Sequence, residues 1–291
     1  MAAGRGTVLV GMLQTLEKPT QLTAMQTSSF LYQQQPIFFR SSGNGKPVVL
    51  LHGFGEDSRV FDALLPHLPD GYQYFLPDLP GSGASPFQPT ISNSIDAMAT
   101  AVLALMQAQQ VSSFTILGHS MGGYIALAMM EQQPAVINGM GLIHSTAFAD
   151  SEEKKMNRRK AMTFMQENGA KAFLKTAIPG LFAPAFVDTN AAVVDTLFQQ
   201  GNDFSAAALV AYYEAMIARP DRTEILRQSQ VPVLFLVGDE DKAVPMQDVL
   251  QQVYLPEQSM VHIMRGIGHM GMLEDTPATA QHIASFLCLL N

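Results

Sequence analysis

Four short apolar runs, each ending in a polar loop, constrain the fold of this 291-residue chain more than any other feature. They are KPVVLLHG at 46–53, YQYFLPDLPGSG at 72–83, SFTILGHS at 113–120 and INGMGLIHS at 137–145. Amphipathic helical patterns lie between them, and one such helix face carries Ile95, Met98, Val102 and Leu105. Strands that alternate with helices predict an α/β fold, with a mostly parallel central sheet and helices on both faces.

The same order resumes near the C-terminus. Strand-like runs recur at 231–238 and 260–266, and a closing helix carries Ile283, Phe286, Leu287 and Leu290. Residues 148–228 contain no strand-like run and indicate several short helices. We therefore expect a helical lid over 148–228, inserted after the fourth parallel strand, and a core made of 25–147 and 229–291.

The N-terminal segment is the least informative part of the chain. Residues 1–24 have no clear partner pattern and are predicted to be an appendage, with disorder as one alternative. From Met25 the chain alternates and bends like an edge hairpin. Arg5 and the apolar TVLVGML after it resemble a signal peptide only weakly, because Glu17 and Lys18 stand where a cleavage site is expected. We therefore predict a cytoplasmic protein.

Charge and composition exclude several classes of partner. The formal net charge of −8 and the pI near 5.3 argue against nucleic-acid binding, which depends on clustered Lys and Arg. The sequence has no run of about 18 apolar residues, so no membrane span is expected. The single cysteine, Cys288, can form no intramolecular disulfide and is expected to be buried in the last helix. The oligomeric state is left open.

One segment carries a candidate nucleophile. ILGHSMGG at 116–123 places Ser120 in a Gly-x-Ser-x-Gly frame between a predicted strand and a predicted helix. Gly118, Gly122 and Gly123 leave room for the strained strand-to-helix turn that exposes a nucleophilic serine. A serine hydroxyl is a weak nucleophile, so it needs a histidine base and an acid that holds the histidine in the right tautomer.

From about Phe30 to its C-terminus the chain resembles the α/β-hydrolase superfamily, in particular serine esterases with a helical lid such as carboxylesterases, enol-lactonases and cofactor-free haloperoxidases. That family orders its site as nucleophile, acid and histidine, and this sequence offers the same order. In LVGDEDKAVP the resemblance assigns the acid to Asp241, with Asp239 and Glu240 as alternatives. In RGIGHMGMLEDTP it assigns the base to His269.

The remaining histidines have other interpretations. His262 lies inside a strand pattern and His144 follows another, so both are expected to be packed or hydrogen-bonded structural residues. In LHGFGED the resemblance places the backbone N–H of Phe54 at an oxyanion site, beside the N–H of Met121, the residue after the nucleophile. His52 is then expected to order this loop rather than act as a base.

No metal or organic cofactor is expected, because a triad and two amides supply the proton transfer and charge stabilisation that ester hydrolysis needs. PDLPGSGAS at 77–85 has neither the lysine of a phosphate-binding P-loop nor the third glycine of a dinucleotide fingerprint. We expect it to be a structural turn in which Asp78 accepts backbone hydrogen bonds.

The predicted activity is hydrolysis of small, largely apolar carboxylic esters or lactones through an acyl-enzyme. The side chains expected around the substrate are those of Phe54, Met121, Val244 and Met270. A basic run at 154–160 is interpreted as a solvated helix face, with an anionic substrate or a carrier protein as the alternative. Other hypotheses stay open: a cofactor-free perhydrolase, a C–C bond hydrolase using the same triad and, from another class, a ligand-binding receptor with slow turnover.

Overall fold

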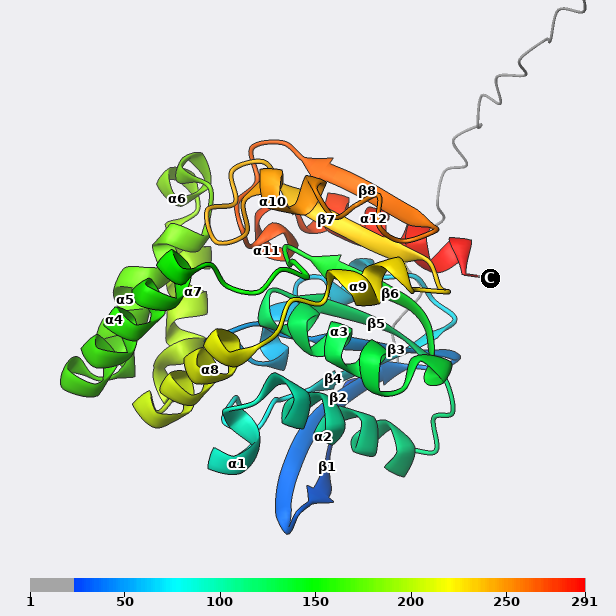
Figure 1. The fold of residues 1–291 in the computed structure, drawn as a ribbon, viewed down its shortest axis with the longest axis horizontal. Helices are drawn as coiled ribbons and strands as arrows, with labels where there is room; N and C mark the ends of the chain where they lie inside the picture. Colours follow the sequence, from blue (N-terminus) through cyan, green and yellow to red (C-terminus); the bar gives the residue numbers. More distant parts are fainter. Residues whose placement is uncertain (1–23, 291) are drawn as a thin grey trace, which may run out of the picture.

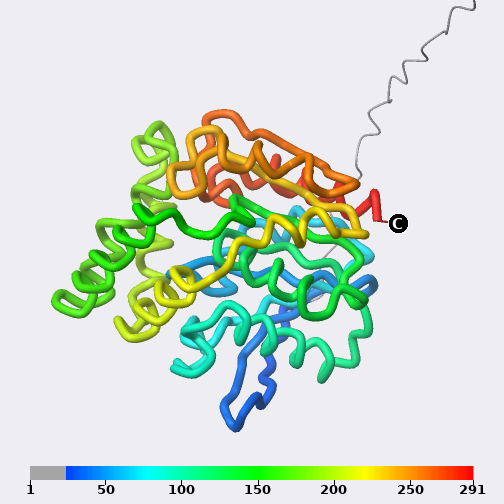
Figure 2. Tube along the Cα trace, viewed as in Figure 1, coloured from blue at the N-terminus to red at the C-terminus, as the bar shows by residue number. Residues whose placement is uncertain are grey.

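The structure is a computed structural model that describes residues 24–290, so the expected appendage lies almost entirely outside the described residues (Figure 1, Figure 2). Eight strands form one sheet in the order β1-β2-β4-β3-β5-β6-β7-β8. They are β1 (Gln26–Tyr32), β2 (Gln35–Gly43), β3 (Lys46–Leu51), β4 (Tyr72–Pro77), β5 (Phe114–His119), β6 (Ile137–Ile143), β7 (Val233–Gly238) and β8 (Ser259–Met264).

The sheet is mostly parallel. β1 pairs antiparallel with β2, and β2 with β4, whereas each neighbouring pair from β4 across to β8 is parallel. β5 and β7 are buried along their whole length, as expected for parallel strands covered on both faces. The predicted α/β sheet and its edge hairpin are confirmed.

Helices cover both faces of this sheet. α2 (Ile95–Ala108) and α3 (Met121–Gln132) pack side by side on one face, and the predicted apolar face of α2 is fully buried. Figure 1 shows α12 (Thr276–Leu289) behind the sheet, on the opposite side from α3. The expected burial of Cys288 is wrong, because α12 turns this residue to solvent and buries its neighbours Phe286 and Leu287.

A helical insertion joins β6 to β7. It contains α4 (Glu152–Asn168), α5 (Ala170–Ala177), α6 (Pro184–Thr189), α7 (Ala191–Gln200), α8 (Ala206–Ala218) and α9 (Thr223–Arg227). All of residues 148–228 are described, and none of them is in a strand. α4 begins where Ser151 accepts a hydrogen bond from the Lys154 N–H, with Glu152 and Glu153 in the first turn. The insertion lies where the sequence predicts it, and its role as a lid stays a prediction.

Shorter elements complete the fold. They are α1 (Pro89–Ser92), α10 (Met246–Leu250), α11 (Gly271–Glu274) and the 3-10 turns Ser58–Phe61, Leu65–His67, Pro134–Val136, Ile178–Leu181 and Gly201–Asp203. Within residues 24–290 no helix combines the length and the apolar character needed to cross a bilayer. The turn after β4 holds Asp78, whose carboxylate accepts the N–H groups of Ser58 and Ala84, as expected.

Parallel strands bring distant parts of the sequence to one edge of the sheet. The loops after β3, β5, β6, β7 and β8 all leave from the carboxyl ends of their strands, where ligands bind in open α/β sheets. Figure 1 shows the helical insertion, from α4 to α8, gathered at one end of the sheet. In strand order, these loops carry Phe54, Ser120, His144, Asp241 and His269.

Candidate active site

Ser120 occupies a strained turn between β5 and α3. Its φ of 50° and ψ of −115° lie where residues other than glycine are rarely found. A Cβ atom on Gly118 would lie 2.3 Å from the backbone of Gly122, and one on Gly122 would lie 2.3 Å from the carbonyl oxygen of Leu51. The turn therefore requires glycine at both positions. Ser145 Oγ donates a 2.7 Å hydrogen bond to the Ser120 carbonyl and helps to fix the turn.

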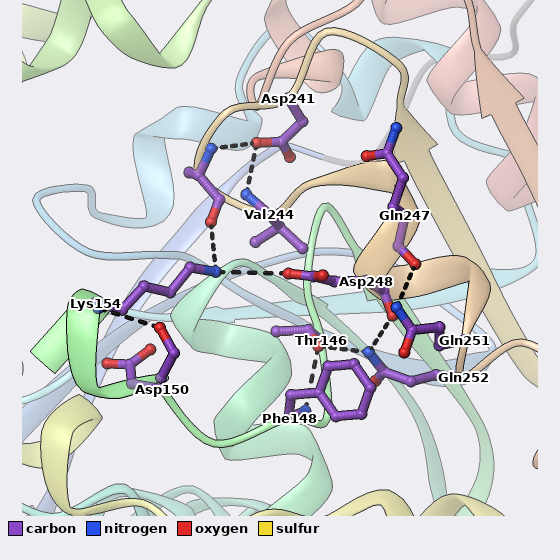
Figure 3. Close-up of polar contacts among 12 residues, drawn as sticks. Thr146, Phe148, Asp150, Lys154, Asp241, Val244, Gln247, Asp248, Gln251 and Gln252 are labelled. Carbon is purple, nitrogen blue, oxygen red and sulfur yellow. Dashed lines mark hydrogen bonds and ion pairs between the residues drawn. The ribbon is translucent and has the colours of Figure 1, made fainter.

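Asp241 lies in the loop after β7, and its own backbone neighbours hold the carboxylate (Figure 3). Oδ1 accepts the N–H groups of Ala243 and Val244, both at 2.8 Å. From α4, Lys154 Nζ donates to the Ala243 carbonyl at 3.3 Å and lies 4.0 Å from Asp248 Oδ2. The loop is thus held both by its own amides and by the helical insertion, and Asp241 Oδ2 is left for another partner.

That partner is His269. Its Nδ1 atom lies 2.8 Å from Asp241 Oδ2, and the two side chains are 4% and 1% exposed. Burial alone would raise the pKa of Asp241, but the electrostatic and hydrogen-bond interactions with His269, together with the neighbouring His144, outweigh it, so this pKa lies well below its ordinary value. An ionised Asp241 accepts the Nδ1–H of His269 and leaves Nε2 as a proton acceptor.

Ser120 and His269 line one cavity of about 130 Å³. Phe54, Tyr124 and Val244 also contribute to its wall. Within the part of the chain that the structure describes, no hydrogen bond joins Ser120 Oγ to the imidazole of His269. Hydrogen bonds between a nucleophile and its base are often long before substrate binds and shorten in the complex. The structure therefore brings the three predicted site residues into one place, with Asp241 directly behind the imidazole.

The alternative acids lie apart from the imidazole. Asp239 is exposed, and its Oδ1 accepts the Gly266 N–H at 2.7 Å. Glu240 is exposed as well, on the same loop. Asp241 is thus the one carboxylate of this loop that contacts His269.

Two other histidines are held by hydrogen bonding or packing, as expected. His52 Nε2 accepts the Leu79 N–H at 3.0 Å, and its Nδ1 lies 2.8 Å from the Gly53 carbonyl oxygen. Nδ1 therefore carries the hydrogen, and the ring orders the loop after β3. On β8, His262 stacks against His282 with ring centroids 3.8 Å apart.

His144 is closer to the site than its sequence context indicates. It is buried, has a φ of 47°, and places Nδ1 3.6 Å from Asp241 Oδ2, which is too long for a hydrogen bond. Within residues 24–290 neither of its ring nitrogens has a hydrogen-bond partner. Burial lowers the pKa of His144 to about 4, against the opposing effect of Asp241, so the ring is neutral at pH 7.

The two predicted oxyanion donors, the backbone N–H groups of Met121 and Phe54, make no hydrogen bond to another described residue. Met121 is the first residue of α3, so its N–H has no acceptor inside the helix. No acceptor among the described residues takes up this N–H or that of Phe54. Phe54 lines the cavity, and its ring stacks on Tyr213 with centroids 4.3 Å apart and planes at 5°.

The side chains of Met121 and Met270 differ from expectation. Both are fully buried in the hydrophobic core, and neither lines the cavity, whereas Phe54 and Val244 do. The turn that exposes Ser120 leaves the next residue at the start of a helix packed on the sheet, so Met121 can offer its N–H to the site but not its side chain.

Sequence reasoning missed a buried ion pair beneath the site. Glu56 Oε2 lies 3.0 Å from His119 Nδ1 and accepts the Gly53 N–H at 2.8 Å, while His119 Nε2 lies 2.9 Å from the His269 carbonyl oxygen. Both ring nitrogens of His119 face acceptors, so the ring is a doubly donating imidazolium. Burial alone would lower the pKa of His119, but Glu56 raises it above its ordinary value. The pair ties the loop after β3 to the loop that carries His269.

The sequence placed each member of this pair near one sheet edge, but it gave no local pattern that links the two. Glu56 stands in LHGFGED and His119 directly precedes Ser120, so both residues follow or end strands whose loops meet at one sheet edge. Within the described residues no three His, Cys, Asp or Glu side chains are arranged to hold a metal ion.

A serine on a strained strand-to-helix turn, with a buried His–Asp pair at the carboxyl edge of a mostly parallel sheet, defines the class of hydrolases that use a nucleophile elbow. A family model described as the alpha/beta hydrolase fold matches residues 46–276. The chain therefore belongs to the α/β-hydrolase family, and it is an esterase-like serine hydrolase. The resemblance that the sequence motifs indicate is confirmed.

Comparison with individual proteins gives the same family. The chain is 28% identical to Lipase 3 of Moraxella sp. (strain TA144) over 248 residues, which cover 83% of this chain and 77% of the lipase. The solved structure of a thermophilic esterase from Thermogutta terrifontis has a TM-score of 0.84 at 27% identity, covering 91% and 99% of the two chains. An enol-lactonase from Burkholderia xenovorans LB400 has a TM-score of 0.82 at 19% identity over 90% and 100%, a likeness of fold.

Proposed function

We propose that the protein hydrolyses carboxylic esters through an acyl-enzyme formed on Ser120. The observation that carries the proposal is that Ser120, on its strained turn, lines the same cavity as His269, whose Nδ1 lies 2.8 Å from Asp241. Similarity to proteins named lipase and esterase supports the ester as the bond that is cleaved.

The proposed reaction has two steps, and His269 Nε2 accepts and returns the proton in each. Ser120 Oγ attacks the ester carbonyl carbon while His269 Nε2 takes the hydroxyl proton, and Asp241 stabilises the imidazolium that forms. The imidazolium returns this proton to the departing alkoxide, which leaves as an alcohol. A water molecule, deprotonated by the same Nε2, then attacks the acyl-enzyme, releases the carboxylic acid and restores Ser120.

Backbone amides stabilise the charge that develops on the carbonyl oxygen. The free N–H groups of Phe54 and Met121 hold the tetrahedral oxyanion, and the N-terminus of α3 adds the positive end of its helix dipole. Loss of one such donor typically costs about 2.7 to 4 kcal/mol of transition-state stabilisation. The shape of these two loops therefore sets a large part of the rate.

The helical insertion acts as a lid and supplies most of the apolar wall of the cavity. The wall residues from the insertion include Leu174, Ala177, Ile178, Leu181 and Leu197. Together with Phe54 and Val244 they favour a small substrate with an apolar segment next to the ester.

Kinetics with a series of aryl esters of increasing acyl length tests the proposal. We expect the wild-type protein to hydrolyse short-chain esters and Ser120→Ala to show only background hydrolysis, with an unchanged thermal unfolding midpoint. Ser29→Ala, which removes an exposed serine on β1, is the matched control and keeps full activity. Undiminished hydrolysis by Ser120→Ala would end the proposal.

A further inference from the structure

One wall of the cavity carries a charge that ester hydrolysis itself does not use. Arg158, on α4, lines the cavity together with Ser120 and His269, and its side chain is 20% exposed. The wall around it is mainly apolar and includes Leu174, Ile178, Leu181, Leu197 and Met216. A guanidinium in an apolar wall attracts an anion more strongly than one in water does, because the local dielectric is low.

The salt bridge of Arg158 does not neutralise this charge. Arg158 Nε and Nη2 donate to the two carboxylate oxygens of Asp150 at 2.6 and 3.3 Å. The same carboxylate lies 3.0 Å from Arg219 Nη1. Within residues 24–290, Asp150 is the one carboxylate within 4.0 Å of either guanidinium. Two positive charges therefore share one negative charge, and the cluster keeps a net charge of about +1 at neutral pH.

Arg219 has the structural role in this cluster. Its side chain is 4% exposed, and its Nη1 and Nη2 donate to the carbonyl oxygens of Met216 and Phe148 at 2.7 and 3.0 Å. Its guanidinium carbon also lies 3.8 Å from the ring centroid of Tyr124. Arg219 is thus tied to the backbone and to a ring as well as to Asp150, whereas Arg158, which shares the same carboxylate, is the member of the cluster that lines the cavity.

Aromatic rings connect Arg158 with the reacting end of the cavity. Its guanidinium carbon lies 5.0 Å from the ring centroid of Tyr213, and Tyr213 stacks on Phe54, whose N–H is a predicted oxyanion donor. These contacts place Arg158 on the same wall as the oxyanion site, with two rings between them. A substrate that reaches both has its ester at one end and an anionic group at the other.

Resting on the proposed function, we propose that Arg158 binds a carboxylate at the far end of the substrate, and that half-esters of dicarboxylic acids are the preferred substrates. The free carboxylate forms charge-assisted hydrogen bonds with the guanidinium while the ester carbonyl lies at Ser120. The reaction is ordinary hydrolysis: water adds, the acyl C–O bond breaks, and the products are a dicarboxylic acid and an alcohol.

The test compares two ester series that differ only in charge. One series contains monomethyl esters of dicarboxylic acids with four to eight carbons, and the other replaces the free carboxylate by a primary amide of nearly the same shape. We expect the wild-type kcat/KM to be about tenfold or more higher for the carboxylate than for the amide at the best chain length. In Arg158→Gln this ratio falls close to one.

A neighbouring arginine supplies the control. Arg159→Gln removes the same charge from an exposed position of α4 and is expected to keep the wild-type ratio and activity. Arg158→Lys keeps the positive charge but lacks the planar guanidinium, so its ratio of kcat/KM for carboxylate over amide is expected to lie between those of the wild-type protein and Arg158→Gln. If Arg158→Gln fails to fold, Arg158→Lys provides the test.

Two results would overturn the proposal: equal kcat/KM for carboxylate and amide in the wild-type protein, or an unchanged ratio in the folded Arg158 variants. Failure of the proposed function looks different. In that case the wild-type protein hydrolyses neither the half-esters, nor their amides, nor neutral short-chain aryl esters.

Discussion

The Nδ1 atom of His269 lies 2.8 Å from Oδ2 of Asp241, deep in the protein. The ionised carboxylate fixes the tautomer in which Nε2 can accept a proton, so Asp241→Asn keeps the shape of the pair and loses its function. The proposed mechanism predicts that kcat on an aryl ester falls by about 10⁴-fold, the loss typical of serine triads. Glu240→Gln, an exposed change one residue away, leaves kcat unchanged. A wild-type kcat in Asp241→Asn would show that the pair is structural.

His144 makes stability depend on pH in a defined window. In the unfolded chain its imidazole binds a proton as the pH falls through about 6.5, whereas burial lowers the pKa of the folded residue to about 4. Between these values the unfolded state binds more protons, so the free energy of unfolding decreases as the pH falls, by up to about 3 kcal/mol from this group. Asp241, His269 and His119 are the titratable groups that face it.

Urea unfolding at pH values from 7 to 4 measures this dependence. His144→Asn removes the imidazole, and asparagine tolerates the positive φ of this position. We expect the variant to lose much of the slope between pH 6.5 and 4. An equally steep slope in the variant would assign the dependence to other groups.

The buried pair of Glu56 and His119 predicts strong energetic coupling. Removal of either partner leaves the other charge buried and unpaired, so Glu56→Gln and His119→Gln are each expected to reduce the free energy of unfolding by about 3–5 kcal/mol. The double variant loses much less than the two single changes together, because no unpaired charge remains. Urea unfolding of the four proteins gives the coupling energy, and additive losses would contradict the ion pair.

The glycine at position 122, in the turn that carries Ser120, predicts a steric loss of stability on substitution, and the exposed Gly180 provides a matched control. An added Cβ at Gly122 would lie 2.3 Å from the carbonyl oxygen of Leu51, a backbone atom in the central sheet. We expect Gly122→Ala to reduce the free energy of unfolding by about 2 kcal/mol or more. At Gly180, which is exposed, no atom lies within 4 Å of such a Cβ, so Gly180→Ala changes stability by less than about 0.5 kcal/mol. Equal effects at both glycines would refute the steric explanation.

Sequence patterns predicted the elements of this fold and the residues at the ends of its strands. The meeting of the loops that carry Ser120, Asp241 and His269 follows from that pattern, because the ends of parallel strands lie at one edge of the sheet. The choice of Asp241 and His269 within their loops came from the family resemblance. Contacts between distant residues were not predictable in the same way. Glu56 and His119 are 63 positions apart, and no local pattern links them.

Arg158 shows a second limit of sequence reasoning. It stands in a basic run that is typical of a solvated helix face, and only its packing against Asp150 and Tyr213 places it on the cavity wall. Met121 shows the converse, since its position next to the nucleophile predicted a substrate contact that the burial of its side chain removes.

Covalent labelling identifies the nucleophile. A fluorophosphonate reacts with an activated serine, and proteolysis with mass spectrometry locates the phosphonylated residue. We predict one label per chain, on Ser120, with labelling slowed in Asp241→Asn and abolished in Ser120→Ala. A label on any other residue of the active protein, or full labelling of Ser120→Ala, would contradict a mechanism built on Ser120.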